Sequence, residues 1–208
     1  DARLPHLRAR LAARQPVEIV AIGGASTAGK AAGSPDLAYP RRLQEALARD
    51  YPALPIAVVN RGVPRQSAED MLARFPRDVL AAHPVLVIWE VGITDAVRGT
   101  DVDDFAATLQ SGVDQLEQRG IDVMFVNMQF SRDMTAIIDF DEYLRALRRV
   151  AEINGLSVFP RFEMMRHWSE AGVFNFDGVA PAERARLAAR VYRCIGDALA
   201  DAIRRAVR

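Results

Sequence analysis

A hydroxyl side chain follows two glycines and an alanine where a buried strand is expected to end. Residues 22–29 read Ile-Gly-Gly-Ala-Ser-Thr-Ala-Gly, and the apolar run 17–22 leads into them. A strand that ends in glycines before a helix marks the edge of an open α/β sheet where ligands bind. Ser26 is therefore a candidate nucleophile, whereas the adjacent Ala25 has no atom that could attack a carbonyl carbon.

Three carboxylates are expected near the same edge, namely Glu90, Asp95 and Asp177. Carboxylates brought together in this way can form a metal site or an acid/base pair. The alternative, which we favour, is that Asp95 braces its own loop and that Asp177 pairs with an arginine. We therefore predict no metal site and no cofactor.

Arg65 is the candidate cation of the site. Our hypothesis is that its side chain points into the pocket and pairs with Asp177 or Glu90, since a guanidinium suits bidentate contact with a carboxylate. The residues that we expect to bind a ligand are Gly24, Ser26, Arg65, Glu90, Asp95 and Asp177.

The three histidines offer no evident general base for Ser26. His6 lies in an amphipathic N-terminal helix pattern, and His83 directly precedes a strand, at its opposite end from the site. His167 belongs to a helical segment, where we expect it on the helix surface. A base near Ser26 is therefore not predicted from the sequence.

The elements that must position these residues alternate regularly between strand and helix. We expect five strands, at residues 17–22, 56–60, 85–90, 121–127 and 156–159, and helices at residues 4–13, 37–50, 67–72, 101–120, 139–153, 161–169 and 181–208. Apolar strands separated by helices predict a parallel sheet that is covered on both faces. No linker or repeat divides the chain, so we expect a single domain over residues 1–208.

Composition excludes several classes of protein. The 208 residues carry 27 basic and 27 acidic side chains, so the totals do not predict binding to nucleic acid or to a membrane surface. No run of 18 apolar residues is present, which argues against a membrane span. Cys194 is the only cysteine, so neither an intrachain disulfide nor a cysteine zinc site is expected.

Four segments give the chain a resemblance to the SGNH (GDSL-type) hydrolases. These segments are residues 22–29, 60–67, 89–96 and 177–181. The resemblance implies a flavodoxin-like α/β/α sandwich with strand order 2-1-3-4-5, and an esterase or acetylesterase ancestry. It also implies a bacterial protein, for which we expect a periplasmic or secreted location, because many relatives are exported and the chain begins at Asp1.

The catalytic residues implied by this resemblance are largely absent. The family serine falls on Ala25 and its acidic neighbour on Gly24. The two oxyanion-hole positions, a glycine and an asparagine in the family, fall on Arg65 and Thr94, and the family histidine falls on Ala180, so only Asp177 is retained.

These departures predict a catalytically inactive domain that binds a ligand or a protein partner. A pocket of small residues beside a cation suits a small anion, an acyl group or a glycan. One alternative is an esterase with a rearranged site that uses Ser26. Another is an engineered inactive variant with Ala25 and Ala180 introduced, which the changes at Arg65 and Thr94 argue against.

Aromatic and methionine side chains gather in residues 159–176. We interpret this cluster as core packing. The alternative is a surface that binds a partner, since an exposed apolar patch marks an interface.

Overall fold

The computed structural model describes residues 4–175 and 179–208. Its sheet has five parallel strands, β1 (Val17–Gly23), β2 (Ile56–Gly62), β3 (Leu86–Glu90), β4 (Asp122–Val126) and β5 (Ser157–Phe159). They are arranged in the order β2-β1-β3-β4-β5, as the family resemblance implied. The predicted strand order is therefore confirmed.

Strands β3 and β4, which lie inside the sheet, are buried along their whole length, which explains their continuous apolar sequence. The register pairs Ile22 of β1 with Trp89 of β3, so the carboxyl ends of these strands lie side by side. Their following segments therefore start from one edge of the sheet, the edge where ligands bind in this architecture.

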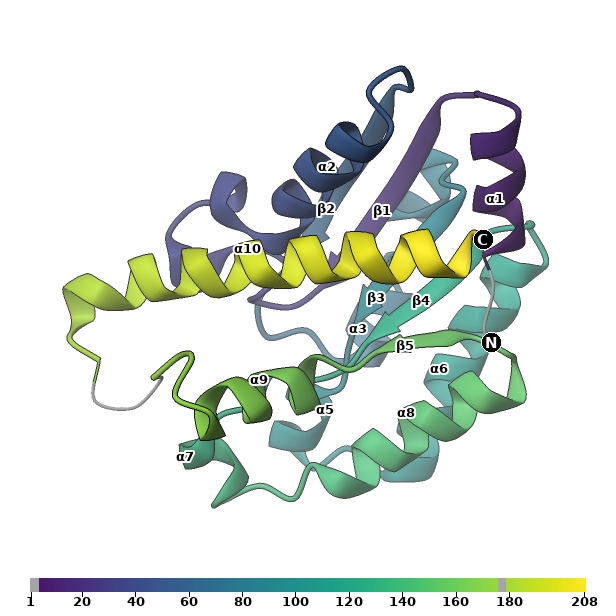
Figure 1. The fold of residues 1–208 in the computed structure, drawn as a ribbon. Helices are drawn as coiled ribbons and strands as arrows, with labels where there is room; N and C mark the ends of the chain where they lie inside the picture. The colour runs from purple at the N-terminus through teal and green to yellow at the C-terminus, as the bar shows by residue number, and fades with distance from the viewer. Residues whose placement is uncertain (1–3, 176–178) are drawn as a thin grey trace.

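Helices cover both faces of the sheet (Figure 1). Three of them bury their apolar residues against one face: α1 (Pro5–Ala12), α2 (Tyr39–Asp50) and α10 (Pro181–Ala206). Others pack on the opposite face, among them α3 (Ala68–Leu72), α4 (Phe75–Asp78), α6 (Val102–Glu117) and α8 (Asp141–Ile153). The alternating side chains of the strands supply a separate core to each layer.

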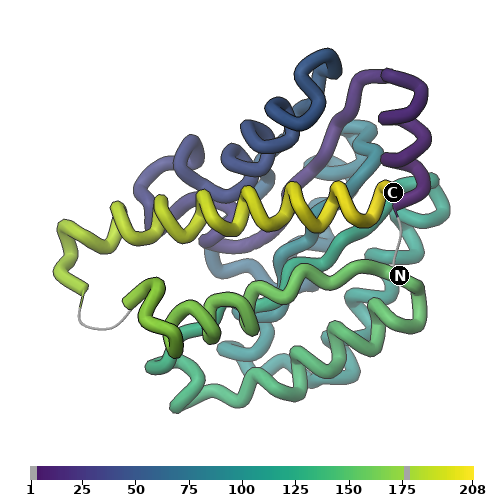
Figure 2. The backbone as a smooth tube through the Cα atoms, in the orientation of Figure 1, coloured from purple at the N-terminus to yellow at the C-terminus, as the bar shows by residue number. Residues whose placement is uncertain are grey.

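Helix α10 lies across one face of the sheet beside α2, and its last turns come close to the beginning of the described chain (Figure 2). The Leu4 backbone N–H donates to the Ala206 carbonyl at 3.2 Å. Gly196 permits the close approach of α10 to α2, because a Cβ at this position would fall within 3 Å of Arg42 and Leu43 atoms. The helix therefore closes the layer that also contains α1 and α2.

Short helices occupy the carboxyl edge: α5 (Ile93–Arg98), α7 (Arg132–Thr135), α9 (Arg161–Glu170), and the 3₁₀ turns η1 (Lys30–Ala32) and η2 (Pro35–Leu37); a third 3₁₀ turn, η3 (Leu80–Ala82), precedes β3. The sequence pattern predicted no helix between residues 90 and 101, and this was wrong, because α5 lies there. Gly92 and Gly99, both with positive φ, bracket a helix too short to show an apolar repeat in the sequence.

The aromatic cluster of residues 159–176 packs mainly into the core, as interpreted from the sequence. Phe159, Phe162, Met165 and Phe174 are buried, while Phe176 lies outside the described residues. In the described part of the chain, no helix combines the length and the apolarity needed to cross a bilayer.

Candidate functional site

The turn that follows β1 is held by its own backbone. Ala28 N–H donates to the Gly24 carbonyl and Lys30 N–H to the Ala25 carbonyl, both at 3.0 Å. Within this turn Ala25 is exposed, whereas the side chain of Ser26 is almost fully buried. The sequence position that the family resemblance gives to the nucleophile thus faces solvent and carries only a methyl group.

A buried glutamate at the end of β3 fixes this turn from below. Glu90 Oε2 accepts the Thr27 hydroxyl at 2.6 Å and the backbone N–H groups of Gly24 and Thr27 at 3.1 and 3.3 Å. Gly23 is required beside it, since a Cβ there would overlap the Thr27 hydroxyl and the Glu90 carboxylate. Glu90 therefore holds the loop rather than facing a ligand.

Arg161, the first residue of α9, neutralises Glu90. Its Nη2 lies 3.0 Å from Glu90 Oε1, and both side chains are at least 97% buried. Burial raises the pKa of Glu90, but the Arg161 cation and the hydrogen bonds from Thr27 and Gly24 outweigh it and hold this pKa below its usual value. Arg161 Nε and Nη1 are buried without a hydrogen-bond partner in the structure.

Two tyrosines complete the buried cluster. The Tyr39 hydroxyl lies 2.8 Å from the Thr27 hydroxyl, and burial raises the pKa of Tyr39 above its ordinary value. Burial also raises the pKa of Tyr192, against a lowering by its hydrogen bond with Ser26. Both phenols therefore stay protonated at neutral pH and cannot act as a base there.

Ser26 is positioned but not activated. Its hydroxyl donates to Gln129 Oε1 at 3.0 Å, and an amide oxygen cannot take up the proton that a nucleophilic serine must lose. His6, His83 and His167 are all exposed, and none of them bonds to Ser26 in the part of the chain that the structure describes. The expectation that His167 lies on a helix surface is met.

The segment that follows β2 is joined directly to the Ser26 turn. Val63 N–H donates to the Gly23 carbonyl at 2.8 Å, and Asn60 Nδ2 donates to the Thr27 carbonyl at 2.6 Å. Gly62 is needed at this contact, because a Cβ there would overlap backbone atoms of Thr27 and Ala28. Arg65 follows two residues after Val63.

The hypothesis that Arg65 pairs with Glu90 was wrong. Glu90 is enclosed and paired with Arg161, while the Arg65 side chain is exposed. The physical reason is that both carboxylate oxygens of Glu90 are bound within the buried cluster, Oε1 by Arg161 and Oε2 by Gly24 and Thr27. The other partner proposed for Arg65, Asp177, lies outside the described residues.

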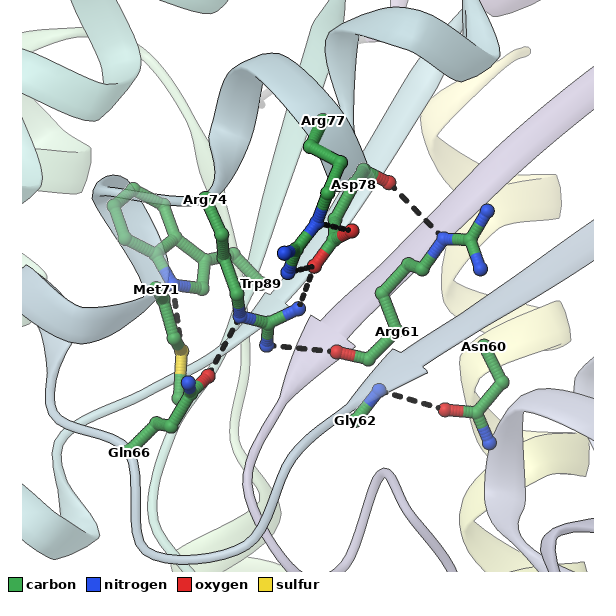
Figure 3. Close-up of polar contacts among 9 residues, drawn as sticks. All are labelled: Asn60, Arg61, Gly62, Gln66, Met71, Arg74, Arg77, Asp78 and Trp89. Atoms are coloured by element: carbon green, nitrogen blue, oxygen red, sulfur yellow. Dashed lines mark hydrogen bonds and ion pairs between the residues drawn. The ribbon is translucent and has the colours of Figure 1, made fainter.

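Arg74 anchors the same loop from the other side (Figure 3). Its guanidinium donates to Gln66 Oε1 at 2.6 Å, to the Arg61 carbonyl at 2.8 Å and to the Asp78 carboxylate at 2.9 Å. The hydrogen bonds from Arg74 and Arg77 lower the pKa of Asp78 and outweigh the effect of burial. The loop of residues 61–67 is therefore fixed at both ends.

Asp95 braces this loop as well. Its buried carboxylate accepts the Ala68 backbone N–H at 3.0 Å, at the start of α3, and burial raises the pKa of Asp95 despite that hydrogen bond. Of the remaining family-equivalent positions, Thr94 is half-buried on α5 and Ala180 is exposed at the start of α10. Asp95 is thus a structural brace, as we favoured, but it braces the start of α3 as well as its own loop.

Sequence reasoning missed Gln129, Arg161, Tyr39 and Tyr192. The sequence contained one weak signal for Arg161, an arginine two residues after the end of the last strand. Among the described residues, no group of three or more His, Cys, Asp or Glu side chains is arranged to hold a metal ion.

Comparisons with known proteins agree with the fold. Residues 1–208 match the profile of the Non-GDSL lipase-like family. A curated acetylxylan esterase from Geobacillus stearothermophilus is 31% identical over 117 residues, which are 49% of this chain and 52% of that protein. The chain thus matches about half the length of this curated relative.

Solved structures of esterases share the architecture. The acetylxylan esterase Axe2 from Geobacillus stearothermophilus has a TM-score of 0.67 at 22% identity, over 85% of this chain and 92% of that one. The acetyl xylan esterase AlAXEase has a TM-score of 0.73 at 17% identity, over 90% and 100%. At these identities the likeness shows the fold alone. Two other Axe2 structures are described as catalytic mutants, one with a serine and one with a histidine replaced by alanine.

Proposed function

Because the chain belongs to the Non-GDSL lipase-like family, we propose that it acts on small acyl esters, bound at the turn of residues 24–27. Acetylated sugars are the ester class that the names of its relatives suggest. The observation that carries the proposal is Ser26, a hydroxyl held by Gln129 at the carboxyl edge of the sheet.

Ester hydrolysis is the form of this function that the comparisons favour over the inactivity predicted from the sequence, and Ser26 is the nucleophile that we propose for it. In this mechanism Ser26 Oγ attacks the ester carbonyl carbon, the alcohol leaves with a proton, and water then releases the acid from the acyl-serine. Without a bonded base, the reaction is limited to the residual rate that positioning and binding supply, far below that of a complete triad.

Binding without turnover is the second candidate. Ala25 occupies the exposed tip of the turn and offers no nucleophile, and the family-equivalent position of the histidine is Ala180. The named catalytic mutants of Axe2 carry alanine in place of a serine and a histidine. The sequence resemblance gives this chain alanine at both of those positions, so it supports a domain that holds an acyl or glycan ligand, or a protein partner.

One experiment separates the two candidates. The protein and its Ser26→Ala variant are incubated with a fluorophosphonate probe and with 4-nitrophenyl acetate, and Ser111→Ala, an exposed serine on α6, is the matched control. Labelling and turnover that only Ser26→Ala abolishes support hydrolysis. Binding of acetylated xylo-oligosaccharides without labelling supports the second candidate. If the protein shows neither labelling nor oligosaccharide binding, the result contradicts an ester-directed function.

Restoring the family residues tests whether the loss of chemistry is recent or engineered. The double variant Ala25→Ser with Ala180→His gains strong esterase activity if the rest of the site is intact. We expect little gain, because Arg65 and Thr94 still replace the oxyanion-hole positions of the family.

A further inference from the structure

Arg65 has a backbone conformation that suits glycine. Its φ is 65°, and among the described residues only Arg14 and His83 share a positive φ without being glycine. A side chain with a Cβ is disfavoured there, since the Cβ crowds the following carbonyl oxygen. Such outliers persist where the surrounding structure imposes them, and they gather at functional sites.

The surroundings of Arg65 do impose this conformation. Arg98 Nη2 donates to the Arg65 carbonyl at 2.9 Å, and Arg98 is itself paired with Asp70 at 2.9 Å. On the two sides of Arg65, Val63 is bonded to Gly23 and Gln66 is bonded to Arg74. The segment is therefore held at three points, two through main-chain atoms and one through the Gln66 side chain, and a glycine at position 65 would adopt this conformation with less strain.

The side chain of Arg65 differs from those of its neighbours in its polar contacts. Arg61, Arg74 and Arg98 all donate to carboxylate or carbonyl oxygens. Within residues 4–175 and 179–208, no hydrogen bond or ion pair involves the Arg65 guanidinium, and the residue is exposed. It thus leaves a cation free on a rigid loop bonded to the Ser26 turn.

We propose that Arg65 is a specificity-determining residue, whose guanidinium binds an anionic group, carboxylate or phosphate, on the ester ligand. A guanidinium on a fixed backbone can offer two parallel N–H donors to such a group. The inference rests on the proposed function, since it presumes that an ester occupies the turn beside this loop. It narrows the ligand class from small esters in general to esters that carry a negative charge.

Binding is measured by calorimetry with three esters: dimethyl succinate, methyl hydrogen succinate and methyl phosphonoacetate. The first is neutral, and the other two carry a carboxylate and a phosphonate. We expect the protein to bind one anionic ester about tenfold more tightly than the neutral one, and Arg65→Gly to abolish this difference. The ester that is preferred identifies the anion.

Arg14→Gly is the matched control, because it removes an arginine of the same backbone conformation from the turn before β1, at the opposite edge of the sheet. Glycine relieves the strain at either position, so we expect both variants to melt a few degrees higher than the parent protein. Only Arg65→Gly is expected to change the binding of anionic esters. A folded, stabilised variant thus excludes unfolding as the cause of lost binding.

Two results overturn the inference while leaving the proposed function in place. These are equal affinity of the parent protein for the three esters, and anionic affinity that is unchanged in Arg65→Gly. If none of the three esters binds, the inference fails, whereas the ester-directed function is decided separately by the fluorophosphonate labelling and by the binding of acetylated xylo-oligosaccharides. Labelling of Ser26 by the fluorophosphonate probe bears only on the proposed function.

Discussion

The ion pair between Glu90 and Arg161 offers the sharpest test of the architecture beneath the site. Replacing Arg161 by Met removes the cation but keeps a long side chain. The Glu90 carboxylate, whose side chain is 3% exposed to solvent, then retains only the donors of Gly24 and Thr27. Removing one partner of a buried pair costs about 3–5 kcal/mol. We expect Arg161→Met to cost about 3 kcal/mol, because three donors still bind Glu90 Oε2 although Oε1 loses Arg161.

Replacing Glu90 by Met is expected to cost more, near the upper end of about 5 kcal/mol. It leaves the Arg161 cation unpaired, with Nε and Nη1 already lacking partners, and it also orphans the backbone N–H groups of Gly24 and Thr27. The double variant is expected to be less unstable than the sum of the single variants by about 1–3 kcal/mol.

Urea unfolding, followed by circular dichroism, measures these differences. The control is Arg49→Met, which breaks a pair with Asp197 whose side chains are 63% and 49% exposed and which is expected to cost less than about 1 kcal/mol. Two results would refute the view that this pair holds the turn. One is a loss of unfolding free energy in Arg161→Met that is no larger than in Arg49→Met, and the other is a double variant whose loss equals the sum of the two single losses.

The pH dependence provides a second readout of the same pair. The pKa of Glu90 is lower in the folded protein than in the unfolded chain, so its stabilisation is complete above the unfolded pKa of about 4.3 and is lost as pH falls through the folded value. The parent protein is therefore expected to lose more stability than Glu90→Met on acidification. Parallel curves for the two proteins would contradict this assignment.

Two further predictions concern the packing and the loop brace. Gly112→Ala is expected to cost about 1–3 kcal/mol and to alter the near-UV circular dichroism of Trp89, since a Cβ on α6 would overlap the indole ring; unchanged stability would show that the ring has room to move. Burial raises the pKa of Asp95, so as pH falls the Asp95 carboxylate binds a proton in the folded protein before it does so in the unfolded chain, and the folded protein gains stability. Asp95→Asn is expected to lack this gain. A difference in unfolding free energy between the two proteins that does not change with pH would contradict the prediction.

The strands were predictable because burial on both faces leaves a direct record in the sequence. The runs that end at Ile22 and Glu90 have almost no polar interruption, so their burial on both faces follows from their composition, and the helices between them indicate a parallel sheet. Helix α5 was missed since its six residues complete fewer than two turns. Tertiary bonds, such as that of Asp95 to Ala68, stabilise this edge of the fold and leave no periodic pattern.

The site was predictable only in part. Glu90 could be placed at a strand end, but its partner Arg161 is 71 positions away, and no spacing rule connects them. Arg65 could be identified as an unusual residue, yet its direction depends on a backbone φ that favours glycine. Side-chain direction at such a position is set by the neighbouring loops and not by local sequence.

Helix α10 has a consequence for how the protein is made. Its residues Val191, Ile195, Leu199 and Ile203 are buried in the layer that also contains α1 and α2, and the Leu4 N–H bonds to Ala206. The ribosome synthesises this helix only after all five strands of the sheet. Until then the face of β1 and α2 stays open to water and to other chains, a state prone to aggregation. During synthesis, the nascent chain is therefore expected to need a chaperone on the face that α10 later covers.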